Sequence, residues 1–150
     1  MRSVVVTDMA ARKAQNAGAL ELIVQAGLGK KAPAARVALR ELPAKEVGPA
    51  LVAAMSDARD KVRAFAVEFG PLGPDLQKHV PLAAMLALAG DSSARVRLSL
   101  LTALNRGWGL SNAPVFSKQA AKVRPVLKKL SADADAKVAK QAAVVLERYG

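Results

Sequence analysis

A pattern that occurs three times in the chain constrains its fold most. Each copy has a proline, an aliphatic run, an aspartate and, five residues after the aspartate, a valine that opens a second aliphatic run. The spacing is kept in Asp57/Val62, Asp91/Val96 and Asp133/Val138, whereas the distance from proline to aspartate varies. The copies are VGPALVAAMSDARDKVRAFAVEFG at 47–70, VPLAAMLALAGDSSARVRLSLLTAL at 80–104 and VRPVLKKLSADADAKVAKQAAVVLERYG at 123–150. The constant part of this internal repeat is therefore a turn between two segments of variable length.

Apolar residues follow each repeated valine at helical spacing, and no segment alternates as a strand would. The expected buried stripes are Val62/Phe65/Ala66/Phe69, Val96/Leu100/Ala103/Leu104 and Val138/Ala142/Val145/Leu146/Tyr149. The repeated aspartate can accept hydrogen bonds from the exposed N–H groups of the helix that follows it. Each copy is therefore predicted to be a helical hairpin.

The turns DARDKVR and DSSARVR resemble the turn of the HEAT repeat, which has a proline-containing first helix, an aspartate in the turn and Val-Arg at the start of the second helix. The resemblance implies an Asp–Arg ladder that links neighbouring repeats, in which we expect Arg63 and Arg97 to be occupied together with Asp57 and Asp91. Ala139 replaces the arginine in the last copy. A degenerate copy at 18–42 aligns Val37 with Val62.

The resemblance implies an all-α fold, a short right-handed α-solenoid of about four HEAT-like hairpins that forms a single domain over 1–150. The repeats are expected at about 18–42, 44–70, 75–106 and 115–150. The expected helices are 17–28/33–42, 44–56/58–69, 75–89/92–106 and 115–131/134–149, with an extra one near 7–15. Pro125 is expected to bend its helix or delay its start.

The formal charge of +11 is unevenly distributed along the chain. Residues 92–132 contain eight basic residues and no aspartate or glutamate. A surface charged only for solubility usually mixes both signs, so this segment favours an acidic partner.

Few residues could support catalysis or a metal site. The chain has no cysteine and one histidine, His79, which is expected to be an exposed residue of a first helical turn. Asp57/Asp60 and Asp133/Asp135 lie in turns, where capping explains them. HEAT-like glycosylases need aromatic residues to hold a base, and this chain has one Trp and one Tyr. We expect no catalytic activity, no cofactor and no metal.

The apolar segments are short. The opening MRSVVVTDMAARK lacks a secretory core, and the longest apolar run, at 80–90, is well below the ~20 residues that span a bilayer. We therefore expect no membrane span and a cytoplasmic location.

Two functions remain as hypotheses. The first is a non-catalytic protein-interaction or scaffold module with a basic surface for an acidic partner; the alternative is a nucleic-acid-binding module that contacts the phosphate backbone without reading sequence. In HEAT proteins the second helices line the inner surface, and the cations expected there are Arg36, Arg40, Arg63, Arg97 and Lys140. The candidate partner-binding residues are Lys30, Lys31, Arg59, Lys61, Arg95, Trp108, Lys118, Lys122, Arg124, Lys128 and Lys129.

The segment LNRGWGLSNAPVF at 104–116 is expected to join the third hairpin to the fourth. Gly107 and Gly109 can end one helix, Ser111 or Asn112 can cap the next, and Pro114 suits a first helical turn. Trp108 and Phe116 are expected to fold back as a lid over the joint. The alternative is that Trp108 contacts a partner.

Overall fold

The computed structural model describes residues 18–29, 32–70, 73–108 and 112–150. Their secondary structure is helical except for one antiparallel pair of two-residue strands, which confirms the all-α class. The expected helix near 7–15 lies outside the described residues. The elements are a helix at 18–27, α2 (Ala32–Glu41), α3 (Ala44–Ala54), α4 (Asp60–Phe69), α5 (Pro74–Gln77), α6 (Leu82–Leu86), the 3₁₀ helix η1 (Ala87–Gly90), α7 (Ala94–Asn105), β1 (Gly107–Trp108), β2 (Ala113–Pro114), the 3₁₀ helix η2 (Ser117–Gln119), α8 (Ala120–Leu130) and α9 (Ala136–Tyr149).

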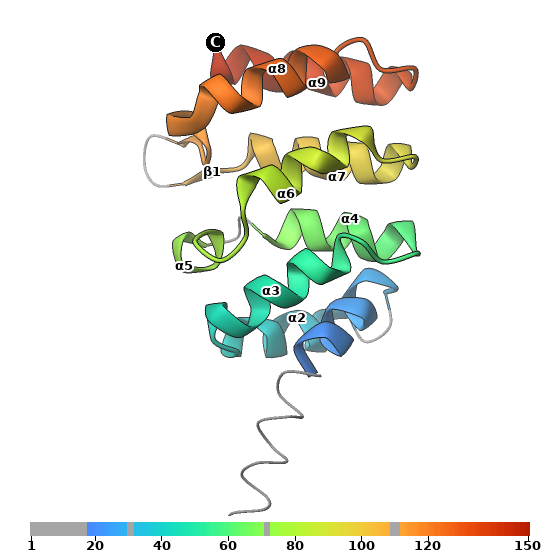
Figure 1. Ribbon diagram of the computed structural model, residues 1–150, viewed down its shortest axis with the longest axis vertical. Coiled ribbons are helices and arrows are strands. Elements are labelled where there is room, and N and C mark those ends of the chain that lie inside the picture. Colours follow the sequence, from blue (N-terminus) through green and yellow to red (C-terminus); the bar gives the residue numbers. More distant parts are fainter. Residues whose placement is uncertain (1–17, 30–31, 71–72, 109–111) are drawn as a thin grey trace, which may run out of the picture.

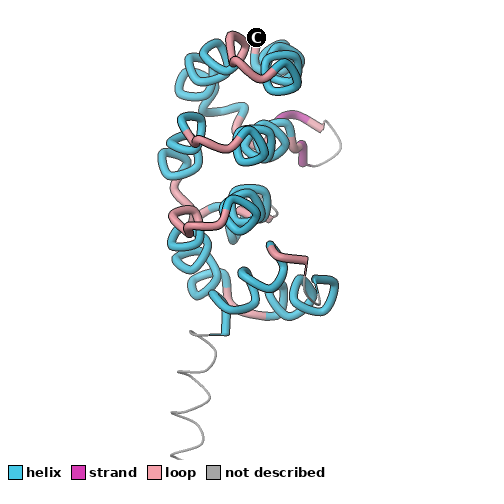
Figure 2. Tube along the Cα trace, turned by 90° about the vertical axis from the view of Figure 1, so that its right-hand side faces the viewer, coloured by secondary structure: helices cyan, strands magenta, loops and turns pink. Residues whose placement is uncertain are grey.

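The helices are stacked along the long axis of the molecule (Figure 1). A view turned by 90° shows two columns of helices side by side, joined by turns at one edge (Figure 2). Helix α4 packs on α7 and α7 packs on α9, while α3 packs on α4 and α8 packs on α9. Helices α4, α7 and α9 therefore follow one another along the stack, and α3 and α8 each pack on the helix that follows them in sequence.

The repeated aspartates close three similar turns. One carboxylate oxygen of Asp57, Asp91 and Asp133 accepts the backbone N–H of the residue two positions on, at 2.9, 2.9 and 2.8 Å. The expectation that these aspartates cap the second helix is wrong in detail, because the helices begin three residues later. Only α9 has a side-chain cap among the three second helices, and it is Asp135, which accepts from the N–H groups of Lys137 and Val138.

Two arginines link successive turns. The Nε and Nη2 of Arg63 donate to the carboxylate of Asp91 at 2.8 and 2.9 Å, and its Nη1 donates to the Asp57 carbonyl at 2.9 Å. Arg97 repeats this arrangement with the Asp133 carboxylate, at 2.8 and 3.0 Å, and the Asp91 carbonyl, at 2.7 Å. The ladder therefore links neighbouring turns as expected, since each guanidinium reaches across to the carboxylate of the next turn, and it also includes Asp133 of the last copy, which the expected set lacked.

The apolar stripes after the repeated valines form the core. Val62, Val96 and Val138 have no exposed surface, and the predicted stripe residues are buried with the exception of half-buried Leu146. The alignment of Val37 with Val62 is wrong, since Val37 is 55% exposed. The buried residues of α2 are Ala35 and Leu39, which lie one turn apart on the other side of that helix.

Two of the expected first helices differ from the structure. The helix expected at 75–89 is interrupted between α5 and α6, because Pro81 lacks an N–H group and disfavours helical backbone at Val80. His79 is exposed as expected, but it lies in this interruption. The helix expected at 115–131 becomes η2 followed by α8, a delayed start, and α8 continues through Pro125.

The joint between α7 and α8 contains the two short strands. Gly107 pairs with Pro114 and Trp108 pairs with Ala113, so Pro114 does not begin a helix as expected. Asn112 has a φ of 51°, and a side chain at Gly107 would overlap the Asn112 side chain and carbonyl. Phe116 is 2% exposed, which confirms that it folds back into the core. Ser111 and the Trp108 side chain lie outside what the structure describes.

Candidate interaction surfaces

The exposed face of η2 and α8 carries four lysines. We define the α8 basic face as Lys118, Lys122, Lys128 and Lys129, all of which are exposed. Lys122 and Lys129 are seven residues apart on an uninterrupted helix, so they share one side of α8, with Lys118 in the turn before it. None of the four forms an ion pair with a residue that the structure describes. This face is therefore positively charged without a local counter-charge.

Arg124 belongs to the same helix but has a different role. Its Nε donates to the Tyr149 carbonyl at 2.7 Å and its Nη2 donates to the Gly150 carbonyl at 2.6 Å. These bonds tie α8 to the end of α9. The guanidinium is occupied within the fold, so Arg124 is a poorer partner-binding candidate than the sequence indicates.

The edge formed by the turns carries cations and carboxylates together. Arg59 is 49% exposed on its side chain but donates through Nε and Nη2 to the Asp57 carboxylate at 2.9 and 3.0 Å. These hydrogen bonds lower the pKa of Asp57 to about 2. Lys61 and Arg95 are exposed, and the hydrogen bond from Ser93 together with the charge of Arg95 lowers the pKa of Asp60. This edge is less strongly basic than the α8 basic face.

The structure also brings together residues that the sequence analysis did not combine. A hollow of about 200 Å³, here called the cationic hollow, is lined by Arg36, Arg40, Phe65, Glu68, Phe69 and Arg106. These residues come from α2, α4 and the residue after α7. The sequence contains one sign of this hollow, which is that Arg36 and Arg40 lie one turn apart on α2. Arg106 joins them only through the packing of three helices, so its position cannot be deduced from sequence spacing.

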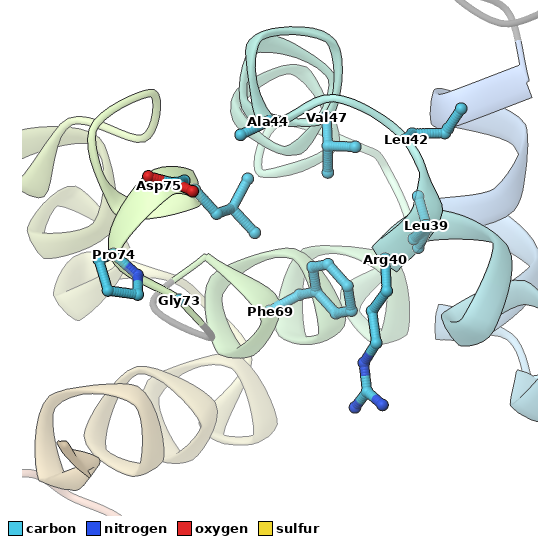
Figure 3. A pocket seen from close by; sticks show the side chains of 10 residues that line it. Leu39, Arg40, Leu42, Ala44, Val47, Phe69, Gly73, Pro74 and Asp75 are labelled. Atoms are coloured by element: carbon cyan, nitrogen blue, oxygen red, sulfur yellow. The ribbon is translucent and has the colours of Figure 1, made fainter. Parts of the chain in front are cut away.

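A second hollow adjoins the first. The apolar hollow, of about 390 Å³, is lined by Leu39, Arg40, Leu42, Ala44, Val47, Phe69, Gly73, Pro74, Asp75 and Leu76. Arg40 and Phe69 line both hollows. In Figure 3 the ring of Phe69 and the side chain of Val47 point into the space between α3 and α4, while the Arg40 side chain extends away from it.

No family model matches this chain. No curated protein and no solved structure matches it either.

The structure does not describe all of the predicted partner-binding residues. Lys30 and Lys31 lie outside the described residues, as does the side chain of Trp108. In the ranges that the structure describes, no group of three His, Asp or Glu side chains could hold a metal ion. Within the same ranges no helix combines the length and the apolar character that crossing a membrane requires.

Proposed function

We propose that the chain is a non-catalytic protein-interaction module that binds an acidic protein through the α8 basic face. The observation that carries this proposal is four exposed lysines on η2 and α8, without an ion-pair partner among the described residues. Such a face attracts an acidic surface from a distance and gains from neutralising it.

We also propose that the stacked hairpins form a short right-handed α-solenoid of the HEAT type. Three features support this: the three similar aspartate turns, the arginines that reach from one turn to the next, and the packing of α4, α7 and α9 in sequence order. A fold of this kind presents an extended surface on which several units can contact one partner.

The aromatic side chains that the structure describes are buried, which favours an acidic protein over nucleic acid as the partner. The only tyrosine, Tyr149, is 5% exposed and its hydroxyl donates to the Leu104 carbonyl, so it cannot stack on a base. Phe65, Phe69 and Phe116 are also buried. Sequence-independent contacts with phosphates remain the alternative, and they require only the lysines.

The proposal is tested with a fluorescently labelled poly-glutamate peptide and a labelled 20-base-pair DNA duplex, each titrated with the protein at 150 mM salt. The charge-reversal variant K118E/K122E/K129E is compared with the control K45E/K78E/K140E, which makes the same change of net charge at exposed lysines on α3, directly after α5 and on α9. We expect the first variant to weaken peptide binding at least tenfold and the control less than threefold. Equal weakening by both variants, or tighter binding to DNA than to the peptide, would contradict the proposal.

A further inference from the structure

We propose that the cationic hollow and the apolar hollow together bind one short segment of a partner protein, in which an acidic side chain lies next to a large apolar side chain. The inference rests on the proposed function, because it takes the chain to be a protein-binding module. It adds a second binding site, on α2, α4 and the end of α7, and it states the chemistry of the segment bound there.

Three arginines line the cationic hollow. Arg36 and Arg40 approach from α2, and Arg106 approaches from the residue that follows α7. None of them is within ion-pairing distance of a carboxylate in the described part of the chain. A guanidinium matches the two oxygens of a carboxylate in a planar, bidentate geometry, so this hollow suits an acidic side chain.

Arg106 gives the strongest sign that an acceptor is missing. Its Nε is buried and has no hydrogen-bond partner among the residues that the structure describes. A buried donor that lacks an acceptor is unfavourable, because it has lost water without gaining a replacement. A carboxylate bound in the cationic hollow places a negative charge beside this guanidinium, which lacks an ion-pair partner among the described residues.

The wall of the cationic hollow holds the arginines in place. The guanidinium carbon of Arg36 lies 5.5 Å from the centroid of the Phe65 ring, and that ring packs on Phe69 with a centroid distance of 5.3 Å. The contact between a guanidinium and an aromatic face is attractive, so Arg36 is partly preorganised. Glu68 is the one carboxylate in the lining, so three positive charges face one negative charge.

The apolar hollow explains why the acidic side chain needs an apolar neighbour. Its volume of about 390 Å³ lies between leucines and valine of α2 and α3, the Phe69 ring of α4 and Leu76 of α5. Burial of a Leu, Ile, Phe or Met side chain there removes apolar surface of both partners from water. Because Arg40 and Phe69 belong to both hollows, the two side chains of the ligand must be close in its sequence.

The charges also determine which side chain of the segment enters which hollow. Asp75 lines the apolar hollow on the side opposite Arg40 (Figure 3). A carboxylate on the ligand is repelled from Asp75 and attracted to Arg36, Arg40 and Arg106. The acidic side chain therefore occupies the cationic hollow and the apolar side chain occupies the other.

A peptide suits this pair of hollows better than nucleic acid. A nucleotide could place its phosphate beside the arginines, but its base would need an aromatic face on which to stack. The Phe65 ring is already covered by Arg36, whose guanidinium carbon lies 5.5 Å from the ring centroid, and the 4% exposure of Phe69 leaves too little of that ring for a base to stack on. An aliphatic or aromatic side chain needs only the apolar walls.

The test begins with a random 12-residue peptide library displayed on phage and selected on the full chain at 150 mM salt. We expect the selected peptides to carry Asp or Glu within two residues of Leu, Ile, Phe or Met. Synthetic copies are then measured by fluorescence anisotropy against three variants. R36Q/R40Q removes two of the arginines, A44F fills the apolar hollow without changing charge, and K122Q/K129Q changes net charge as R36Q/R40Q does but on the α8 basic face.

We expect R36Q/R40Q to weaken binding at least tenfold, A44F at least fivefold and K122Q/K129Q less than twofold. Circular dichroism checks that each variant is folded. The proposal is overturned if no peptide is enriched or if the enriched peptides lack the acidic–apolar pair. It is also overturned if R36Q/R40Q and K122Q/K129Q weaken binding equally. If the peptide test gives one of these results while K118E/K122E/K129E still weakens poly-glutamate binding at least tenfold, only the proposed hollow site is wrong and the proposed function stands.

Discussion

Replacement of Arg97 by alanine tests the linkage between successive turns. The Arg97 and Asp133 side chains are 15% and 10% exposed, so the pair is neither a surface ion pair nor fully buried. Exposed pairs contribute about 0–1 kcal/mol, whereas removal of one partner of a buried pair costs about 3–5 kcal/mol. The substitution also leaves the Asp91 carbonyl without its 2.7 Å donor. We therefore expect R97A to lower the free energy of unfolding by about 2–3 kcal/mol.

The measurement is urea-induced unfolding at pH 7, followed by circular dichroism, for R97A, D133A, the double variant and the wild type. A double-mutant cycle isolates the interaction between the two side chains, which we expect to be about 1–2 kcal/mol. The control is R95A in the same turn, because Arg95 is exposed and is expected to change stability by no more than about 0.5 kcal/mol.

The reasoning is refuted if R97A and R95A are equally stable, or if the coupling between Arg97 and Asp133 is zero within error. Either result would mean that the arginine contacts between successive turns do not contribute to the stability of the fold. The similar arrangement of Arg63 and Asp91 would then lose its structural interpretation as well.

Three further predictions concern the turns, the joint and the end of α9. Hydrogen bonds from Arg59, Arg63 and Arg97 lower the pKa values of Asp57, Asp91 and Asp133, that of Asp57 to about 2. The stability that these contacts add is therefore complete well above the unfolded pKa of 3.8 and is lost as pH falls toward 2, so the urea midpoint should change little between pH 7 and 5 and should be clearly lower at pH 2.5; a constant midpoint would be incompatible with these contacts. G107A forces the chain apart at Asn112 and should destabilise the fold by about 1–3 kcal/mol, against little change for G73A, whose site is open. Burial raises the pKa of Tyr149 to about 12, and because it is the only tyrosine, absorbance at 295 nm reports it alone; a midpoint near 10 in the folded protein would contradict its burial.

The positions of the buried valines and of the turns follow from sequence periodicity alone. Val62, Val96 and Val138 are buried because each lies at the same place in a local pattern, and that pattern is short enough to be read along the chain. The partner of Arg63 does not follow from it. The aspartates of its own turn and of the next turn have the same sequence context, and only the spacing between stacked helices selects Asp91.

The candidate site was predicted less completely than the fold. Lys122 and Lys129 lie two turns apart on α8 and therefore on one side of it. Val123 and Leu127 occupy the buried side of the same helix, so the exposure of the two lysines could be predicted. The bonds from Arg124 to the end of α9 depend on contacts between α8 and α9 that sequence patterns do not contain. Arg106 reaches the cationic hollow only because α2, α4 and α7 pack together, so its role could not be anticipated.

The most direct test of the central claim is affinity capture from a nuclease-treated lysate of the source organism, followed by quantitative mass spectrometry. The wild-type chain, K118E/K122E/K129E and the control K45E/K78E/K140E are compared as baits. The account predicts an acidic protein that the wild type and the control retain and that the α8 variant loses. Retention of that protein by the α8 variant, or its equal loss from both variants, would contradict the proposal that the α8 basic face is the binding surface.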